Sequence, residues 1–209
     1  MLISPQDNVI VRPETKYIGN ISSLLKIAAI QNNSSVDQTD MVNINGEVIS
    51  VPKSISKTRD LVGFTTNDIQ PGDIAIFSFK VIYDFVQKEP DAEPVYRNRI
   101  FYNGVEYFTA HIRHIYGVIR KGEIIMVNGY VMVSDFEEPK IFIPAHQKRV
   151  KGTTTSHIMH IGNPLIGETS IMAKQGDEVV FNPKYAQKYQ INGKPFCILQ
   201  QSQILGKVE

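Results

Sequence analysis

Short runs in which apolar and polar residues alternate make up most of this chain. Alternation of this kind is typical of a strand with one buried and one exposed face. The clearest runs are residues 8–12, 46–51, 74–77 and 130–133. Apart from one apolar island at residues 22–30, no stretch has the period of a helix. The pattern therefore predicts an all-β protein.

Two glycine-aspartate turns divide the chain into similar halves. Gly72-Asp73 and Gly176-Asp177 are each followed by an apolar run that ends in phenylalanine. Glycine supplies the positive φ of such a turn, and aspartate can accept a hydrogen bond from nearby backbone. The flanking blocks repeat in the same order, and the pairs Asn8/Tyr130, Gly46/Ser156, Gly72/Gly176 and Asn103/Asn192 fix their offsets at 122, 110, 104 and 89 residues. We therefore predict two copies of one β domain, residues 1–122 and residues 123–209, with longer loops in the first copy.

The longest of these extra segments follows the strand at 74–77. Residues 78–86 alternate well enough to lengthen that strand, residues 88–94 form a charged turn with two prolines, and the chain returns through residues 95–102. These features predict a hairpin insertion over residues 78–99. Asn103-Gly104 then predicts a tight type I′ turn, because both of its central positions favour positive φ.

Composition excludes several classes of protein. Lys and Arg total 22 against 21 Asp and Glu, which gives no long-range field for nucleic acid or an anionic membrane. The single cysteine, Cys197, excludes an intramolecular disulfide and a cysteine-rich zinc site and favours a reducing compartment. We find no signal-peptide pattern and no apolar stretch of membrane-spanning length. We expect a soluble cytoplasmic protein.

The order of the blocks resembles the GroES family of co-chaperonins, also called the chaperonin-10 family. The resemblance lies in a Val-Ile-Val first strand, a loop with an apolar tripeptide, a Gly-Glu-Val strand, the Gly-Asp-Ile-x-Ile-Phe phrase and a closing strand after Asn-Gly, and it recurs in both halves. It implies two tandem GroES-like, partly open β-barrels. It further implies a homo-oligomer without enzymatic activity or cofactor. Such a protein caps a GroEL-type chaperonin ring and leaves ATP hydrolysis to that ring.

The resemblance also implies which residues bind the partner. In the family, the loop after the first strand is mobile when free and inserts an apolar tripeptide into a groove of the chaperonin. By position, these residues are Leu24, Leu25 and Ile27 in the first half and Ile141, Phe142 and Ile143 in the second. The residues themselves also fit ordinary strand or core positions, and the island at 22–30 also fits a short helix capped by Ser22 or Ser23.

Four features with chemical potential have plainer interpretations. The histidine pairs His111/His114 and His157/His160 lie in predicted strands, where an i, i+3 spacing points to opposite faces, so we expect no metal site. The glycine-rich segment 162–169 has Glu168 where a phosphate loop needs lysine, so we expect a flexible connection and no nucleotide site. The basic segment 146–151 lacks interleaved aromatic residues and fits a solvated loop. Cys197 lies in a strand beside Phe196, and we expect a buried, inert thiol.

Two other functions compete with the co-chaperonin hypothesis. A structural or assembly module, for example a virion component, would keep the fold without binding a chaperonin, and the large insertion over residues 78–99 favours it. An enzyme is the third class, because a GroES-like barrel forms the substrate domain of zinc alcohol dehydrogenases. Those enzymes need a dinucleotide domain and zinc-binding cysteines, and neither is found in this sequence.

Overall fold

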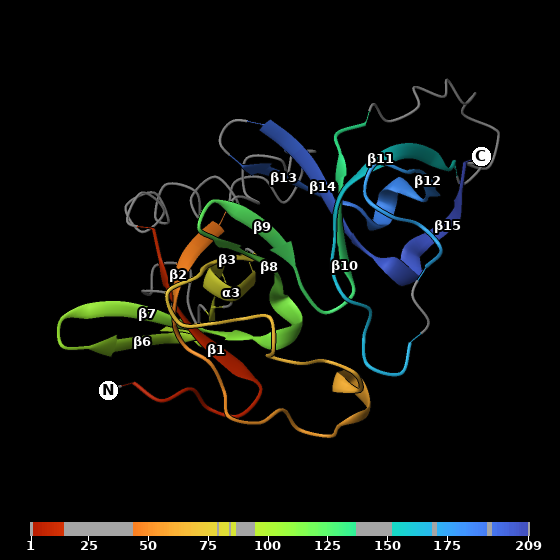
Figure 1. Ribbon diagram of the computed structural model, residues 1–209. Coiled ribbons are helices and arrows are strands. Elements are labelled where there is room, and N and C mark those ends of the chain that lie inside the picture. The colour runs from red at the N-terminus through yellow and green to blue at the C-terminus, as the bar shows by residue number, and fades with distance from the viewer. Residues whose placement is uncertain are drawn as a thin grey trace.

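Strands form nearly all of the regular structure in the computed structural model (Figure 1). The structure describes residues 2–14, 44–78, 80–83, 85–86, 95–136, 152–168, 171–191 and 194–208. Among these residues the one α-helix is a single turn, so the all-β prediction is confirmed. No helix in the described ranges is long and apolar enough to cross a membrane.

The first half forms a seven-stranded antiparallel sheet in the order β6-β7-β1-β2-β3-β8-β9. Its strands are β1 (Asn8–Pro13), β2 (Ile44–Ser50), β3 (Ile74–Phe77), β6 (Arg99–Tyr102), β7 (Val105–His111), β8 (Ile115–Arg120) and β9 (Glu123–Met126). A 3₁₀ turn, Arg59–Leu61, lies between β2 and β3, and another, Ile112–His114, joins β7 to β8. Beside this sheet lie α3 (Lys80–Tyr83) and a small hairpin of β4 (Phe85–Val86) and β5 (Val95–Tyr96).

The second half forms a six-stranded antiparallel sheet in the order β13-β14-β10-β11-β12-β15. Its strands are β10 (Tyr130–Ser134), β11 (Thr154–Ile161), β12 (Glu178–Phe181), β13 (Gln187–Ile191), β14 (Lys194–Gln200) and β15 (Ile204–Lys207). The 3₁₀ turns Pro183–Tyr185 and Gln201–Gln203 precede β13 and β15.

Six strands of the first sheet, β6-β7-β1-β2-β3-β8, have the same order and the same register as the six strands of the second sheet, and β9 is additional. Val11 pairs with Phe108 in the first sheet, and Val133 pairs with Cys197 in the second, which are the positions that the sequence offsets of 122 and 89 relate. A β-bulge interrupts the ladder before Val11 and again before Val133. A shared bulge is informative because an extra residue shifts all later pairs of a ladder.

The glycine-aspartate turns are also matched in detail. Gly72 and Gly176 have φ values of 90° and 91°, the left-handed conformation that the sequence predicts for them. The Gly72 N–H donates to Val48 O at 2.8 Å, and the Gly176 N–H donates to Ile158 O at 2.8 Å. Each turn thus leads the chain into its third strand in the same way.

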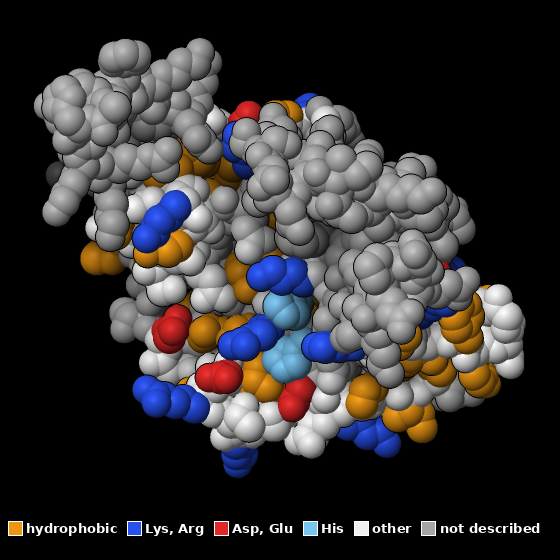
Figure 2. Space-filling view, turned by 180° about the vertical axis from the view of Figure 1, so that it is seen from behind, with side chains coloured by type: hydrophobic (Ala, Val, Ile, Leu, Met, Phe, Trp, Pro, Cys, Tyr) orange, Lys and Arg blue, Asp and Glu red, His pale blue; other side chains and the backbone are white. Residues whose placement is uncertain are grey.

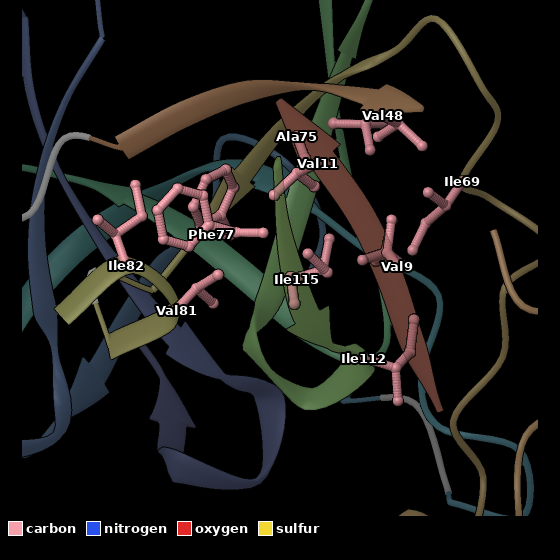
Figure 3. Close-up of a cluster of buried hydrophobic side chains, with 14 of the residues drawn as sticks. Val9, Val11, Val48, Ile69, Ala75, Phe77, Val81, Ile82, Ile112 and Ile115 are labelled. Carbon is pink, nitrogen blue, oxygen red and sulfur yellow. The ribbon is translucent and has the colours of Figure 1, made fainter. Parts of the chain in front are cut away.

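Each sheet buries its own apolar face. In the first half, Val9, Val11, Val48 and Phe77 meet Ile112 and Ile115 in one buried cluster (Figure 3). In the second half the equivalent cluster contains Val131, Val133, Ile158, Val179, Phe181, Cys197 and Leu199. Fully burying one such side chain stabilises the fold by roughly 1.5–3 kcal/mol, so each half has a core of its own.

The segment after β3 differs from the sequence prediction. Residues 78–86 do not lengthen the strand, because the chain turns into α3 after Ser78, whose carbonyl accepts the Val81 N–H at 3.0 Å. Val81 and Ile82 are 2% and 1% exposed and point toward Phe77 (Figure 3). A hairpin is present, but β4 and β5 have only two residues each, and β6 pairs with β7 instead of extending the hairpin.

A third buried cluster joins the two sheets. It contains Ile76 and Tyr116 from the first sheet, Met126 from β9, and Tyr130, Met132, Tyr189, Ile191 and Ile198 from the second. The Tyr189 hydroxyl donates to the Phe77 carbonyl, and the Tyr116 hydroxyl donates to Gln187 Oε1 at 2.6 Å. We call this cluster the joint. It fixes the two halves to each other through packing and through these hydrogen bonds, of which the one between Tyr189 and Phe77 is buried.

Candidate functional site

The predicted partner-binding residues lie outside the described residues. Leu24, Leu25 and Ile27 belong to segment 15–43, and Ile141, Phe142 and Ile143 belong to segment 137–151. The structure does describe the strands on either side of each segment. Segment 15–43 connects β1 to β2, and segment 137–151 connects β10 to β11, which are equivalent places in the two sheets.

The two strands that flank segment 15–43, β1 and β2, are paired up to the ends of that segment. The Glu14 N–H donates to Asn45 O at 3.1 Å, and the Arg12 guanidinium forms an ion pair with Glu47. The backbones also come close at Gly46, where an added Cβ would lie 2.8 Å from Arg12 O. The two ends of segment 15–43 are therefore held side by side by backbone pairing.

The second segment starts from an equivalent closure made with different side chains. Ser156 stands where the first half has Gly46, and its hydroxyl donates to the Ser134 carbonyl at 2.7 Å. Phe136, the last described residue before the segment, packs edge-to-face against Phe181 with ring centroids 5.2 Å apart. We call the strand ends that flank each of these two segments its loop base. The second loop base is anchored to the core of its own sheet, since Phe181 is fully buried.

A groove of about 520 Å³ lies beside the first loop base. Its lining combines the apolar residues Pro13, Ile74 and Val105 with the charged residues Arg12, Glu14, Glu47 and Glu106. Grooves lined by apolar residues and a few charged groups suit peptide or small-molecule contacts. No residue of this groove was among the predicted site residues, because its walls come from four separate parts of the chain.

A second opening separates the two sheets next to the joint. It has a volume of about 470 Å³ and is lined by Lys80, Arg113 and His114 from the first half and by Gln187 and Gln200 from the second. Figure 2 shows, on one face of the molecule, two adjacent histidine side chains bordered by lysine and arginine side chains. The sequence reasoning missed this cleft, since nothing in the sequence places residues 80, 113 and 187 together.

The glycine-aspartate turns carry the clearest electrostatic feature of each sheet. Burial of Asp73 opposes its ionisation, but hydrogen bonds from Arg120 and from the Gln70 N–H outweigh burial and hold its pKa below 3.8. In the second half, the ammonium of Lys207 and the Lys174 N–H lower the pKa of Asp177. Both carboxylates therefore serve the turn and are already fully engaged, so neither is a candidate acid or base.

Three of the four features with plainer interpretations lie wholly or mostly among the described residues. His111 is the last residue of β7, but His114 belongs to the 3₁₀ turn that follows, and their rings lie 6.1 Å apart. The prediction that this pair lies in one strand and points to opposite faces is therefore wrong, whereas His157 and His160 both lie in β11. Among the described residues, no three His, Cys, Asp or Glu side chains come together in a way that could hold a metal ion. Cys197 is fully buried, as predicted.

The glycine-rich and basic segments have different outcomes. The glycine-rich segment packs against the first half, where the Ile166 N–H donates to Gly63 O at 3.0 Å. Its last residue, Thr169, is not described. The basic segment 146–151 lies outside the described residues.

Comparison with known families concerns the second half. Residues 123–208 match the family model of the chaperonin 10 Kd subunit. The match supports a GroES-type domain over this part of the chain, which contains β9 and the whole second sheet. No curated protein matches the chain. The chaperonin-10 match covers the second loop base, between Ser134 and Ser156, and therefore includes the segment that holds Ile141, Phe142 and Ile143.

Proposed function

We propose that this protein is a tandem co-chaperonin. Each half is a GroES-like domain, and the two apolar tripeptides bind a GroEL-type chaperonin ring so that the protein caps it during ATP-dependent folding. The single observation that carries the proposal is the chaperonin-10 match over residues 123–208. We extend the proposal to the first half because the strand order and ladder register of the matched half recur there.

The loop bases support the same proposal. In both halves the segment with the tripeptide leaves and re-enters the sheet between the first and second strands of that half. Two such segments on one chain would add avidity, since the second contact forms at a high effective concentration once the first is made. Several weak contacts would then keep the cap bound to the ring and still allow its release.

Binding to a chaperonin ring tests the proposal directly. The protein is mixed with a GroEL-type ring in the presence and absence of ATP, and complexes are separated by size and weighed by native mass spectrometry. We expect binding to depend on nucleotide and to be lost when Leu24, Leu25 and Ile27 are all changed to serine. Replacing Ile141, Phe142 and Ile143 by serine is expected to weaken binding as well.

A matched control uses the same first segment. Changing Asn32 and Asn33 to serine alters the segment without touching the tripeptide, and binding should stay at the wild-type level. Equal binding by the tripeptide and control variants would refute the assigned contact. Absence of any complex with the unaltered protein would refute the co-chaperonin function itself.

The second candidate is a structural or assembly module without chaperonin binding. The added α3 turn and the β4–β5 hairpin favour it, because they enlarge only the first half and have no counterpart in the second sheet as described. The same mixing experiment separates the two candidates. A module of this kind would stay unbound at every nucleotide condition.

A further inference from the structure

The cleft between the two sheets, next to the joint, is lined by two cations that form no ion pair. Lys80 begins α3, and Arg113 lies in the 3₁₀ turn between β7 and β8. Both residues are exposed, and among the described residues no carboxylate forms an ion pair with either. Four other cations do have a carboxylate partner, namely Arg12, Arg99, Arg120 and Lys207.

The lining of this cleft has a positive charge. Among the described lining residues Asp60 is the one carboxylate, so Lys80 and Arg113 together with Asp60 give two positive charges against one negative charge when His114 is neutral. Two like charges that line one opening favour an anion between them, because each attracts the anion and the anion offsets their mutual repulsion. The charge of the lining therefore indicates a site for an anion.

The second half contributes neutral hydrogen-bond donors to the same cleft. The Tyr116 hydroxyl donates to Gln187 Oε1 at 2.6 Å, and the Gln200 N–H donates to Gln203 Oε1 at 2.8 Å. Each of these two amide groups has its oxygen engaged and keeps the two N–H donors of its Nε2 atom. Gln187 and Gln203 both line the cleft, so both can donate to an anion there without giving up their existing hydrogen bonds.

We propose that this cleft binds the phosphate group of a small molecule. A phosphate group carries about −1.5 to −2 charges at pH 7 and has three strong acceptor oxygens, which suits two cations and several N–H donors better than a single carboxylate does. The volume of about 470 Å³ lies within the range of small-molecule sites. Phe64, which is half-buried, lines the same cleft and offers an apolar surface to the rest of the molecule.

A phosphate group in this cleft contacts both halves of the chain. Lys80 and Arg113 belong to the first half, and Gln187 and Gln203 belong to the second. A ligand that binds only the folded, joined arrangement stabilises it by an amount that grows with the ligand concentration. The site therefore links the concentration of a phosphorylated small molecule to the stability of the joint.

Titration calorimetry with defined anions tests the site. The full chain is titrated with pyrophosphate, with inorganic phosphate and with citrate, at constant ionic strength set by sodium chloride. We expect saturable binding of both phosphates and no saturable binding of citrate, which is a carboxylate anion. Tighter binding of pyrophosphate would support a phosphorylated small molecule as the ligand, and tighter binding of inorganic phosphate would support the free ion.

Gln187→Glu tests one donor and leaves the hydrogen bond of Tyr116 in place. The glutamate keeps an oxygen for the Tyr116 hydroxyl, but it replaces the two N–H donors with a second anionic oxygen. We expect the dissociation constant for pyrophosphate to rise by about tenfold or more. Gln190→Glu is the matched control, because it makes the same change of charge in β13 at a residue outside the cleft lining. Salt screens a charge about 10 Å away, so the control should bind almost as the unaltered protein does.

Removing both cations tests the other side of the cleft. We expect the variant with Lys80→Gln and Arg113→Gln to lose saturable binding of pyrophosphate. The variant with Lys121→Gln and Lys184→Gln removes the same charge at two exposed residues outside the cleft, and it should keep binding. Thermal unfolding without any anion checks that each variant is folded.

Three results would overturn this proposal. The first is that neither phosphate binds saturably to the unaltered protein. The second is that citrate binds as tightly as pyrophosphate, and the third is that each cleft variant binds pyrophosphate as well as its matched control. All of these measurements use the protein without a chaperonin, so a failure here is distinct from a failure of the proposed function.

Discussion

The Tyr189 hydroxyl donates a hydrogen bond to the backbone carbonyl of Phe77, across the joint between the two sheets. Both residues are buried, with 2% and 0% of their surfaces exposed. Tyr130 lies in the same cluster, and its hydroxyl donates to Arg113 O at 2.8 Å. Burial raises the pKa of Tyr130 to about 12, so it stays protonated as a donor at all physiological pH values.

Removing the hydroxyl of Tyr189 is expected to weaken the joint. Tyr189→Phe leaves a buried carbonyl without this donor, which costs about 1–3 kcal/mol of unfolding free energy. Urea denaturation followed by far-UV circular dichroism measures the change. Tyr185→Phe is the control, since Tyr185 is 47% exposed, and it should change stability by less than about 0.5 kcal/mol. Equal effects of the two variants would argue against a stabilising joint.

The salt bridge of Asp73 should make stability depend on acid. The folded-state pKa of Asp73 lies below 3.8, so its stabilisation is present above that value and is lost as the pH falls through the folded pKa. We expect Asp73→Asn to destabilise the protein by about 1.5–3 kcal/mol at pH 7, because it leaves Arg120 without its charged partner. The difference from the unaltered protein should shrink toward pH 3.

Thermal unfolding at several pH values checks this dependence. Asp60→Asn is the control, because Asp60 is exposed on the 3₁₀ turn between β2 and β3. Its effect on the free energy of unfolding should be small. A loss of stability in Asp73→Asn that is the same at pH 3 and pH 7 would mean that the ion pair does not contribute.

Gly162 should be sensitive to a single added methyl group. A Cβ at this position would lie 2.7 Å from Met126 O, on the backbone of β9, so the backbone itself would have to move. We expect Gly162→Ala to cost about 1–3 kcal/mol of unfolding free energy. Gly206→Ala is the control, since a Cβ there meets nothing within 4 Å. Comparable stability of the two variants in dilute solution would contradict the close packing at the joint.

The thiol of Cys197 should be protected in the folded protein. Cys197 is fully buried between β13 and β10 in the second sheet. We expect a thiol reagent such as dithionitrobenzoate to react at a rate set by opening of the sheet, and to react at once in denaturant. Rapid labelling of the native protein would show that this core is open to solvent.

Local signals predicted part of this fold from the sequence. Gly72 and Gly176 needed only their own turn chemistry, and the repeat of Asn8 at Tyr130 gave the correct ladder register because an insertion in a loop leaves strand pairing unchanged. Residues 78–86 were mispredicted, because a short apolar run fits either a strand or a helix and the core around Phe77 decides between them. The pairing of β9 and the hydrogen bond of Tyr189 to Phe77 depend on contacts far apart in the chain, which no local pattern records.

In the candidate site, too, local sequence signals predicted some features, whereas contacts between distant segments determine others. The sequence repeat predicts that Leu24 and Ile141 lie between the first and second strands of their halves. In the structure, those strands do flank both segments and meet near Gly46 in the first half and near Ser156 in the second. Binding by these residues stays a prediction that follows from the resemblance. The groove beside Pro13 and the cleft beside Arg113 could not be predicted, because each is assembled from segments that are distant in sequence.

The placement of β9 determines how the chain can be divided. By sequence β9 follows residue 122, yet by hydrogen bonding it completes the edge of the first sheet. A fragment that ends at residue 122 would leave β8 uncovered, and a fragment that begins at residue 123 would carry an unattached strand. Two such fragments should therefore reassociate when mixed, because β9 of one fragment pairs with β8 of the other. The chain could thus be used as a split protein whose two parts are joined by this strand pair.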